Sequence, residues 1–81
     1  MVERVTECLE LAFAGISLDL EEVPGGRISG SAVWDGFADL DQVDRQQQLR
    51  TVLRRDLGAE ATLVGVILTY TPHELDAMKA A

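Results

Sequence analysis

The sequence is poor in several residue types that would define a protein class. Its 81 residues include one cysteine, and no apolar run reaches the roughly 18 residues that cross a bilayer. The single Cys8 cannot form a disulfide within the chain, which favours a reducing compartment. The opening residues MVERVTE place acids where a secretory signal would be basic and then apolar. We therefore expect a cytoplasmic protein.

Basic residues are also scarce. Seven Lys and Arg face fourteen Asp and Glu, which gives a net charge of −7. Because nucleic-acid affinity depends largely on neutralising phosphates, this balance opposes it unless the basic side chains cluster. The same charge repels anionic membrane surfaces, so we expect no membrane partner. The hydrophobic content of 47 % is ordinary for a folded chain, and the length suits one domain spanning residues 1–81.

The residues needed for catalysis or metal binding are nearly absent. His73 is the only histidine, so no Ser–His–Asp arrangement and no cluster of metal ligands can be assembled around it. We interpret His73 as a solvated side chain in the first turn of a helix. Cys8 lies beside an apolar helical stripe, where neighbouring acids raise a thiol pKa, so we interpret it as a small packed side chain. We expect no catalytic residue, no bound metal and no cofactor, and hence a protein that is not an enzyme.

Hydrophobic periodicity predicts alternating helices and strands. Helical spacing covers 2–14, alternation with period two covers 16–23, and a Pro-Gly-Gly turn separates that strand from a second one at 28–34. A helical stretch, an apolar strand and a short helix follow at 39–57, 61–70 and 72–80. This order, α-β-β-α(α)-β-α, predicts an α+β fold with a three-stranded mixed sheet covered on one face by helices.

The boundaries of the later elements carry specific signals. Asp39 can cap the long helix with Gln42 three positions on, and Asp41 and Arg45 are spaced for an ion pair on the helix surface. An offset in the apolar stripe hints at a short first helix that bends into a longer second one. The run 61–70 is apolar on both alternating faces, so we expect it to be well covered and joined to the hairpin by a right-handed parallel crossover. The segment Thr71-Pro-His-Glu has the pattern of a capping box.

One cluster of polar residues stands out against the acidic background. The window 40–57 holds four of the seven basic residues against three acids. On a helix, Gln47, Arg50 and Arg54 form one column beside the apolar stripe. One interpretation is that this surface contacts a partner protein or a phosphate backbone. The other is that it is a solvated face with ion pairs to nearby aspartates. The candidate site residues are Arg45, Gln46, Gln47, Arg50, Arg54 and Arg55.

Two motifs and the element order resemble a known family. Asp35-x-Phe37 is followed by Val43-x-Arg45-Gln-Gln, and TYTPHEL resembles an aromatic–Thr–Pro–x–Glu ending. With the order of helices and strands, these make the chain similar to BolA-like proteins along nearly its whole length. The resemblance implies a fold akin to class II KH domains. The chain departs from the family pattern at Asp39, where the family has Gly, and at Leu75, where it has an aromatic residue.

The resemblance also implies a function. Family members are regulatory proteins linked to the stress response, and they share an iron–sulfur cluster with a monothiol glutaredoxin through a histidine at the start of the last strand. That position is Leu63 here, and the hairpin loop VPGGR offers no Cys or His. We therefore expect an adaptor that contacts a monothiol glutaredoxin or another protein without ligating a cluster. The alternative is a KH-like nucleic-acid-binding transcriptional regulator that uses the Arg45–Arg55 helix.

Overall fold

The computed structural model describes residues 1–80 and contains the predicted elements in the predicted order. Within that range no helix is both long and apolar enough to cross a bilayer. The elements are α1 (Val2–Ala12), β1 (Ser17–Val23), β2 (Arg27–Val33), the 3₁₀ turn η1 (Asp35–Phe37), α2 (Gln42–Leu57), the 3₁₀ segment η2 (Gly58–Leu63), β3 (Val64–Tyr70) and α3 (Pro72–Ala80).

The three strands form one mixed sheet in the order β1-β2-β3. β1 and β2 form the predicted antiparallel hairpin, and β2 pairs in parallel with β3, so both β1 and β3 are edge strands. The register between β2 and β3 shifts once: Ile28 pairs with Val64, but Gly30 pairs with Ile67. This irregularity places one extra residue in β3 near its start, a β-bulge that disturbs the ladder there.

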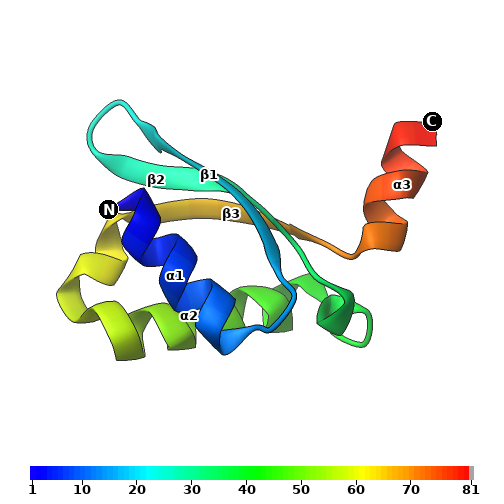
Figure 1. Cartoon of the computed structure of the whole chain (residues 1–81), viewed down its shortest axis with the longest axis horizontal. Helices are drawn as coiled ribbons and strands as arrows, with labels where there is room; N and C mark the ends of the chain where they lie inside the picture. Colours follow the sequence, from blue (N-terminus) through cyan, green and yellow to red (C-terminus); the bar gives the residue numbers. More distant parts are fainter. Residues whose placement is uncertain (81) are drawn as a thin grey trace.

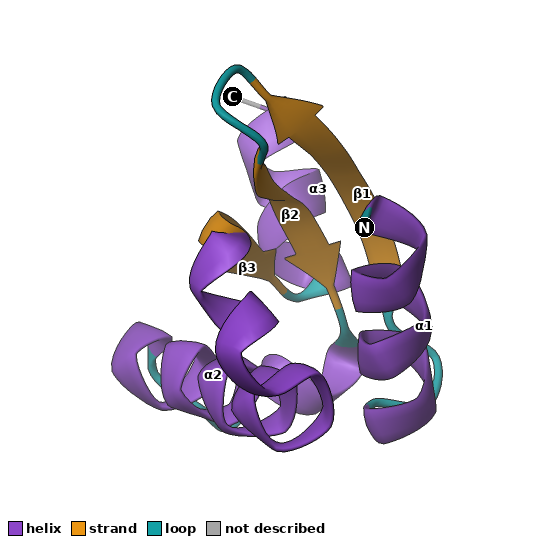
Figure 2. Ribbon diagram, turned by 90° about the vertical axis from the view of Figure 1, so that its left-hand side faces the viewer, coloured by secondary structure: helices purple, strands orange, loops and turns teal. Residues whose placement is uncertain are grey.

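Two helices cover one face of the sheet, as the sequence predicted. α1 and α2 lie together beneath the strands, while α3 stands apart at the far end of β3 (Figures 1 and 2). The core fills the space between the sheet and these two helices, and α3 has no buried residue. The buried apolar residues are Val5, Cys8, Leu9, Phe13, Ile16, Ile28, Ala32, Phe37, Leu49, Leu53 and Ile67.

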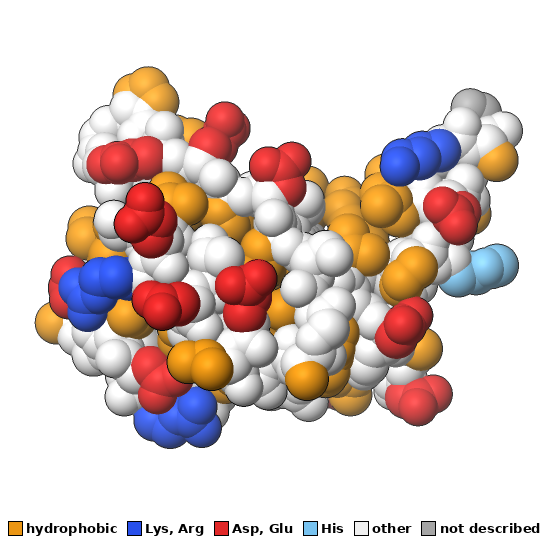
Figure 3. Space-filling view, viewed as in Figure 1, with side chains coloured by type: hydrophobic (Ala, Val, Ile, Leu, Met, Phe, Trp, Pro, Cys, Tyr) orange, Lys and Arg blue, Asp and Glu red, His pale blue; other side chains and the backbone are white. Residues whose placement is uncertain are grey.

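The expectation that the apolar run of β3 is well covered holds for one face only. Ile67 and Thr69 face the helices and are buried, whereas Val66 and Leu68 on the opposite face are 66 % and 51 % exposed. The reason is that, within residues 1–80, the helices packed on the sheet lie on one side of it, so an apolar run does not by itself imply two covering layers. The side of the molecule seen in Figure 3 carries scattered acidic side chains and apolar patches.

A glycine allows the hairpin strands to approach closely. Gly30 in β2 is opposite Leu20 and has a φ of +155°. A Cβ at this position would overlap the backbone carbonyl of Asp19, which no rotamer change can relieve. The glycine at this position of β2 therefore has a steric cause.

The beginning of α2 differs from the expectation. Asp39 does not cap the helix, because Phe37 is buried in the 3₁₀ turn η1 and the chain enters α2 only at Gln42. The N-cap is Asp41, whose Oδ1 accepts a hydrogen bond from the Asp44 N–H at 2.9 Å. Of the two offset apolar residues, Leu40 lies in a bend before the helix and Val43 lies within α2, so there is no separate short α-helix.

The capping box of α3 is confirmed. The Thr71 hydroxyl accepts a hydrogen bond from the Glu74 N–H at 3.1 Å, and a Glu74 carboxylate oxygen accepts one from the Thr71 N–H at 2.9 Å. Pro72 occupies the first helical position, where its missing N–H costs nothing. The strand β3 therefore stops and α3 starts at the boundary that the sequence indicated.

Candidate functional site: a groove between α2 and β3

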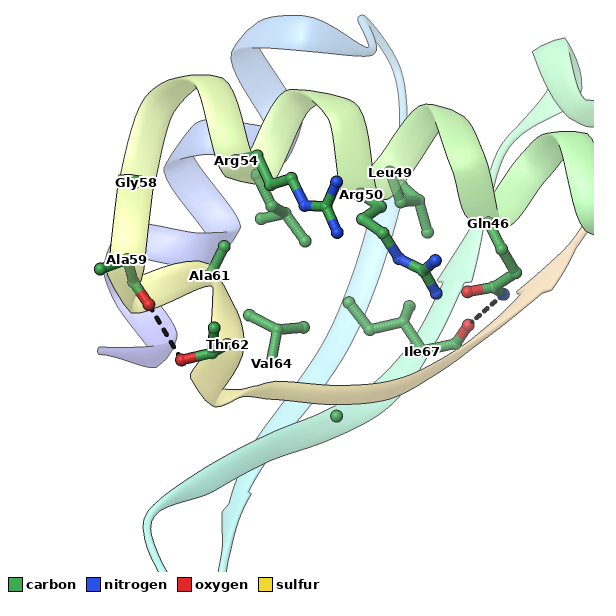
Figure 4. A pocket seen from close by; sticks show the side chains of 12 residues that line it. Gln46, Leu49, Arg50, Arg54, Gly58, Ala59, Ala61, Thr62, Val64 and Ile67 are labelled. Carbon is green, nitrogen blue, oxygen red and sulfur yellow. Dashed lines mark hydrogen bonds between the residues drawn. The ribbon is translucent and has the colours of Figure 1, made fainter.

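A pocket of about 500 Å³ opens between the second half of α2, η2 and the first half of β3. We call it the α2–β3 groove. Its lining residues come from three elements that are joined in sequence, so the fold of one segment creates it (Figure 4). They are Gln46, Leu49, Arg50, Leu53, Arg54, Gly58, Ala59, Ala61, Thr62, Val64, Gly65 and Ile67.

The groove has an apolar floor and a basic rim. Leu49, Leu53 and Ile67 form much of the floor and are also core residues. Arg50 and Arg54 lie on exposed positions of α2, and their guanidinium groups extend into the space above the floor (Figure 4). Neither side chain makes a hydrogen bond or an ion pair with any residue in the range 1–80. An arginine without a partner beside apolar surface can recruit an external anion at little cost in lost contacts.

At one end of the groove, side chains of α2 cap the edge of β3. Gln46 donates a hydrogen bond to the Ile67 carbonyl at 2.7 Å, and Gln42 donates one to the Thr69 carbonyl at 3.2 Å. The Thr69 hydroxyl in turn donates to the Gln42 amide oxygen at 2.6 Å. An edge strand whose carbonyls are occupied in this way is a poor template for pairing with another chain.

Arg45 is buried and holds α3 in place. It is 3 % exposed, and its guanidinium makes a two-pronged ion pair with Glu74, with N–O distances of 2.8 and 3.0 Å. Its Nε also donates to the carbonyls of Phe37 and Leu40, at 3.1 and 2.9 Å. The predicted surface pair with Asp41 is therefore wrong: Arg45 points into the protein, where five N–H donors need several acceptors. In this position it is a structural residue and not a surface contact.

The same pair fixes the charge of Glu74. The hydrogen bonds from Arg45, followed by the backbone hydrogen bond from Thr71, lower the pKa of Glu74 from 4.5 to about 2. The pKa of Arg45 is raised, chiefly by the hydrogen bond to Glu74. Both groups are therefore charged across the physiological range, and the link between α2 and α3 is ionic.

The other candidate residues lie away from the groove. Gln47 is exposed and lines a separate shallow depression with Phe13. Arg55 is exposed and pairs with Asp56 at 2.9 Å, as expected for a solvated ion pair. The column that faces the groove therefore contains Gln46, Arg50 and Arg54. The predicted column began with Gln47 in place of Gln46.

Sequence reasoning missed Gln42 and Glu74 as parts of this region. Each was assigned to a helix cap, and Glu74 does complete the cap of α3. Their contacts with Thr69 and Arg45 join residues 27 and 29 positions apart, and no local spacing reveals such pairs. Only the joint placement of β3 and α2 could have indicated them.

Cys8 is packed and His73 is exposed, as the sequence predicted. Cys8 is 7 % exposed and lies 3.4 Å from a carboxylate oxygen of Asp56. Burial, followed by the hydrogen bond to Asp56, raises the pKa of Cys8 from 9.0 to about 11. His73 is exposed in α3. In the part of the chain that the structure describes, no three His, Cys, Asp or Glu side chains are grouped to hold a metal ion.

Solved structures decide which fold this is. BolA1 from Arabidopsis thaliana is 23 % identical, with 89 % of this chain and 92 % of that chain covered and a TM-score of 0.74. The BolA domain of SufE1 from the same plant is 26 % identical over the same shares, with a TM-score of 0.73. The chain has a BolA-like fold. A bol-like protein from Babesia bovis agrees, at 21 % identity, 95 % and 91 % coverage and a TM-score of 0.67.

Sequence comparison alone does not reach this BolA-like fold. No protein-family model matches the chain, and no curated protein matches it. The resemblance that the motifs indicated is therefore carried by spatial arrangement more than by identity. In this BolA-like fold, Leu63 is the last residue of η2, beside the groove, and is 39 % exposed.

Proposed function

We propose that this BolA-like protein is a non-enzymatic adaptor that binds another protein through the α2–β3 groove. The observation that carries the proposal is the pair Arg50 and Arg54, which extend over an apolar floor without a partner in residues 1–80. Apolar surface with a few well-placed charged groups is the composition of a protein-binding pocket. An adaptor of this kind would act in the cytoplasm, as the sequence predicts.

The composition of the groove supports a protein partner over a nucleic acid. None of its lining residues is aromatic, so it offers no platform on which a base could stack. The net charge of −7 also opposes a polyanion at long range. A local basic rim on an acidic molecule is better suited to a defined partner with a small number of acidic groups.

The resemblance supplies a first partner to test, a monothiol glutaredoxin. By the resemblance, Leu63 stands at the position of the family histidine, and a leucine cannot bind iron, so we propose contact without a shared cluster. One of the similar structures is named as the BolA domain of SufE1, so there the fold is one part of another protein. This also supports a role in joining proteins.

Nuclear magnetic resonance can test this proposal. Adding a monothiol glutaredoxin to the ¹⁵N-labelled protein should shift amides of α2, η2 and β3 that line the groove, and Arg50→Ala with Arg54→Ala should weaken the shifts. Arg55→Ala is the matched control and should leave them unchanged. Amide shifts confined to α1 and β1 would contradict binding through the groove. So would the absence of shifts both with the glutaredoxin and with cell-extract proteins fractionated by affinity.

A visible absorption spectrum tests the cluster. Co-expression with the glutaredoxin should give the spectrum of the glutaredoxin cluster alone, whereas Leu63→His should alter it if only the missing ligand prevents sharing. A distinct spectrum from the unmodified chain would show that Leu63 does not abolish ligation.

A further inference from the structure

We infer that the α2–β3 groove takes an extended acidic segment of the partner, with two carboxylates two residues apart. The inference rests on the proposed function and specifies the chemistry of the partner. It follows from a series of contacts between α2 and β3 that begins outside the groove and is interrupted within it.

The contacts follow a fixed step along both elements. Gln42 reaches the Thr69 carbonyl and Gln46 reaches the Ile67 carbonyl, so four residues forward in α2 correspond to two residues back in β3. The steps match because four helical residues advance about 6 Å and two strand residues about 7 Å. The next two side chains in the α2 column are Arg50 and Arg54, and both line the groove.

The series stops where the regular pairing of β3 with β2 is interrupted. The next residue in step would be Gly65, which lies in the stretch where the register with β2 shifts. Val64, the residue before Gly65, is the first residue of β3, and η2 ends at Leu63. Arg50 and Arg54 therefore continue the column after the row of carbonyls has been interrupted. Each guanidinium keeps its five N–H donors without an acceptor from residues 1–80.

An acidic extended segment supplies what is missing. Carboxylates bind guanidinium groups in a two-pronged geometry, as Arg45 and Glu74 already do in this protein. In an extended chain, acids at alternate positions share a face about 7 Å apart, close to the spacing of arginines one turn apart. Apolar residues beside the acids would cover the floor formed by Leu49, Leu53 and Ile67.

A labelled hexapeptide with Glu at its second and fourth positions and apolar residues elsewhere is the probe. We expect saturable binding to the full chain by fluorescence anisotropy or, for weak binding, by amide shifts. Arg50→Ala and Arg54→Ala should each weaken binding about tenfold, equivalent to about 1.4 kcal/mol. Arg55→Ala should leave binding unchanged, and a peptide with Gln at both positions should bind at least tenfold more weakly.

Each other outcome overturns the inference. Equal binding of the Glu and Gln peptides would remove the role of the carboxylates. Tighter binding of a short single-stranded oligonucleotide, with the same dependence on Arg50 and Arg54, would assign the groove to nucleic acid. If a protein partner shifts the groove amides but the Glu peptide neither binds nor competes, the acidic-segment inference fails while the adaptor proposal stands.

Discussion

The two ends of the contact between α2 and β3 carry similar polar side chains. Those at one end are hydrogen-bonded within residues 1–80, and the arginines at the other end are not. At the closed end, Gln42, Arg45 and Gln46 are all hydrogen-bonded to β3 or α3. At the open end, Arg50 and Arg54 have no partner among residues 1–80 and face a pocket. From this difference we expect the closed end to determine the stability of the fold and the open end to determine binding of a partner. Four substitutions or conditions can test this division.

The largest effect is expected at the closed end, from Arg45→Met. It removes several charge-assisted hydrogen bonds and leaves the carbonyls of Phe37 and Leu40 without their donor, so we expect a loss of about 3 kcal/mol in the free energy of unfolding. Urea denaturation followed by circular dichroism measures it. The control is Arg55→Met, at an exposed ion pair, which should cost far less than Arg45→Met because solvent screens the pair. Equal losses for the two variants would refute the division.

The ionic link between Arg45 and Glu74 should appear as a dependence of stability on pH. Because the pKa of Glu74 falls from 4.5 to about 2 on folding, its contribution is complete above pH 4.5 and is lost as the pH falls toward 2. The stability advantage of the unmodified chain over Glu74→Gln should therefore shrink steadily across that window. A constant difference between the two proteins from pH 5 to pH 2 would mean that the carboxylate does not titrate with folding.

A smaller effect is expected from Gln46→Ala, which uncovers one carbonyl on the edge of β3. We expect a loss of about 1 kcal/mol, the typical net contribution of a single hydrogen bond. Gln47→Ala is the matched control, since Gln47 makes no side-chain hydrogen bond to the described residues, and it should be nearly neutral. The same denaturation assay applies, and a larger loss for the Gln47 variant would show that the cap on the strand edge is not what matters.

The smallest effect on stability belongs to the open end. Arg50→Ala and Arg54→Ala should change the free energy of unfolding by no more than about 0.5 kcal/mol, because neither side chain has a hydrogen bond or ion pair to lose in residues 1–80. Parallel denaturation and peptide-binding measurements on the same samples would separate the two roles. If either variant lost more than about 1 kcal/mol, the arginines would be part of the fold and the proposed groove would lose its support.

Local patterns predicted those parts of the fold that depend on neighbouring residues. The hairpin followed from a Pro-Gly-Gly turn between alternating segments, and the start of α3 followed from Thr71, Pro72 and Glu74. Each of these signals is complete within a few positions of sequence. The BolA-like resemblance likewise came from short motifs in a fixed order and is confirmed by solved structures with similar folds.

The errors arose where distant parts of the chain decide the outcome. Asp41 is a suitable local partner for Arg45, but the burial of Arg45 and the arrival of Glu74 from α3 determine the actual pair. The exposure of Val66 agrees with the predicted sheet covered on one face, whereas the apolar composition of the strand wrongly favoured more cover. The groove lies beside a register shift in β3, for which Gly65 is a weak sequence signal.

The attachment of α3 has a consequence for the motions of the molecule. This helix buries no side chain, so the hydrophobic effect contributes little to its docking, and its position depends on the capping box and one ion pair. Such a segment opens in brief local excursions while the rest of the structure stays intact. Its backbone amides should exchange with deuterium far sooner than those of β2, so this short chain contains two units of different lifetime.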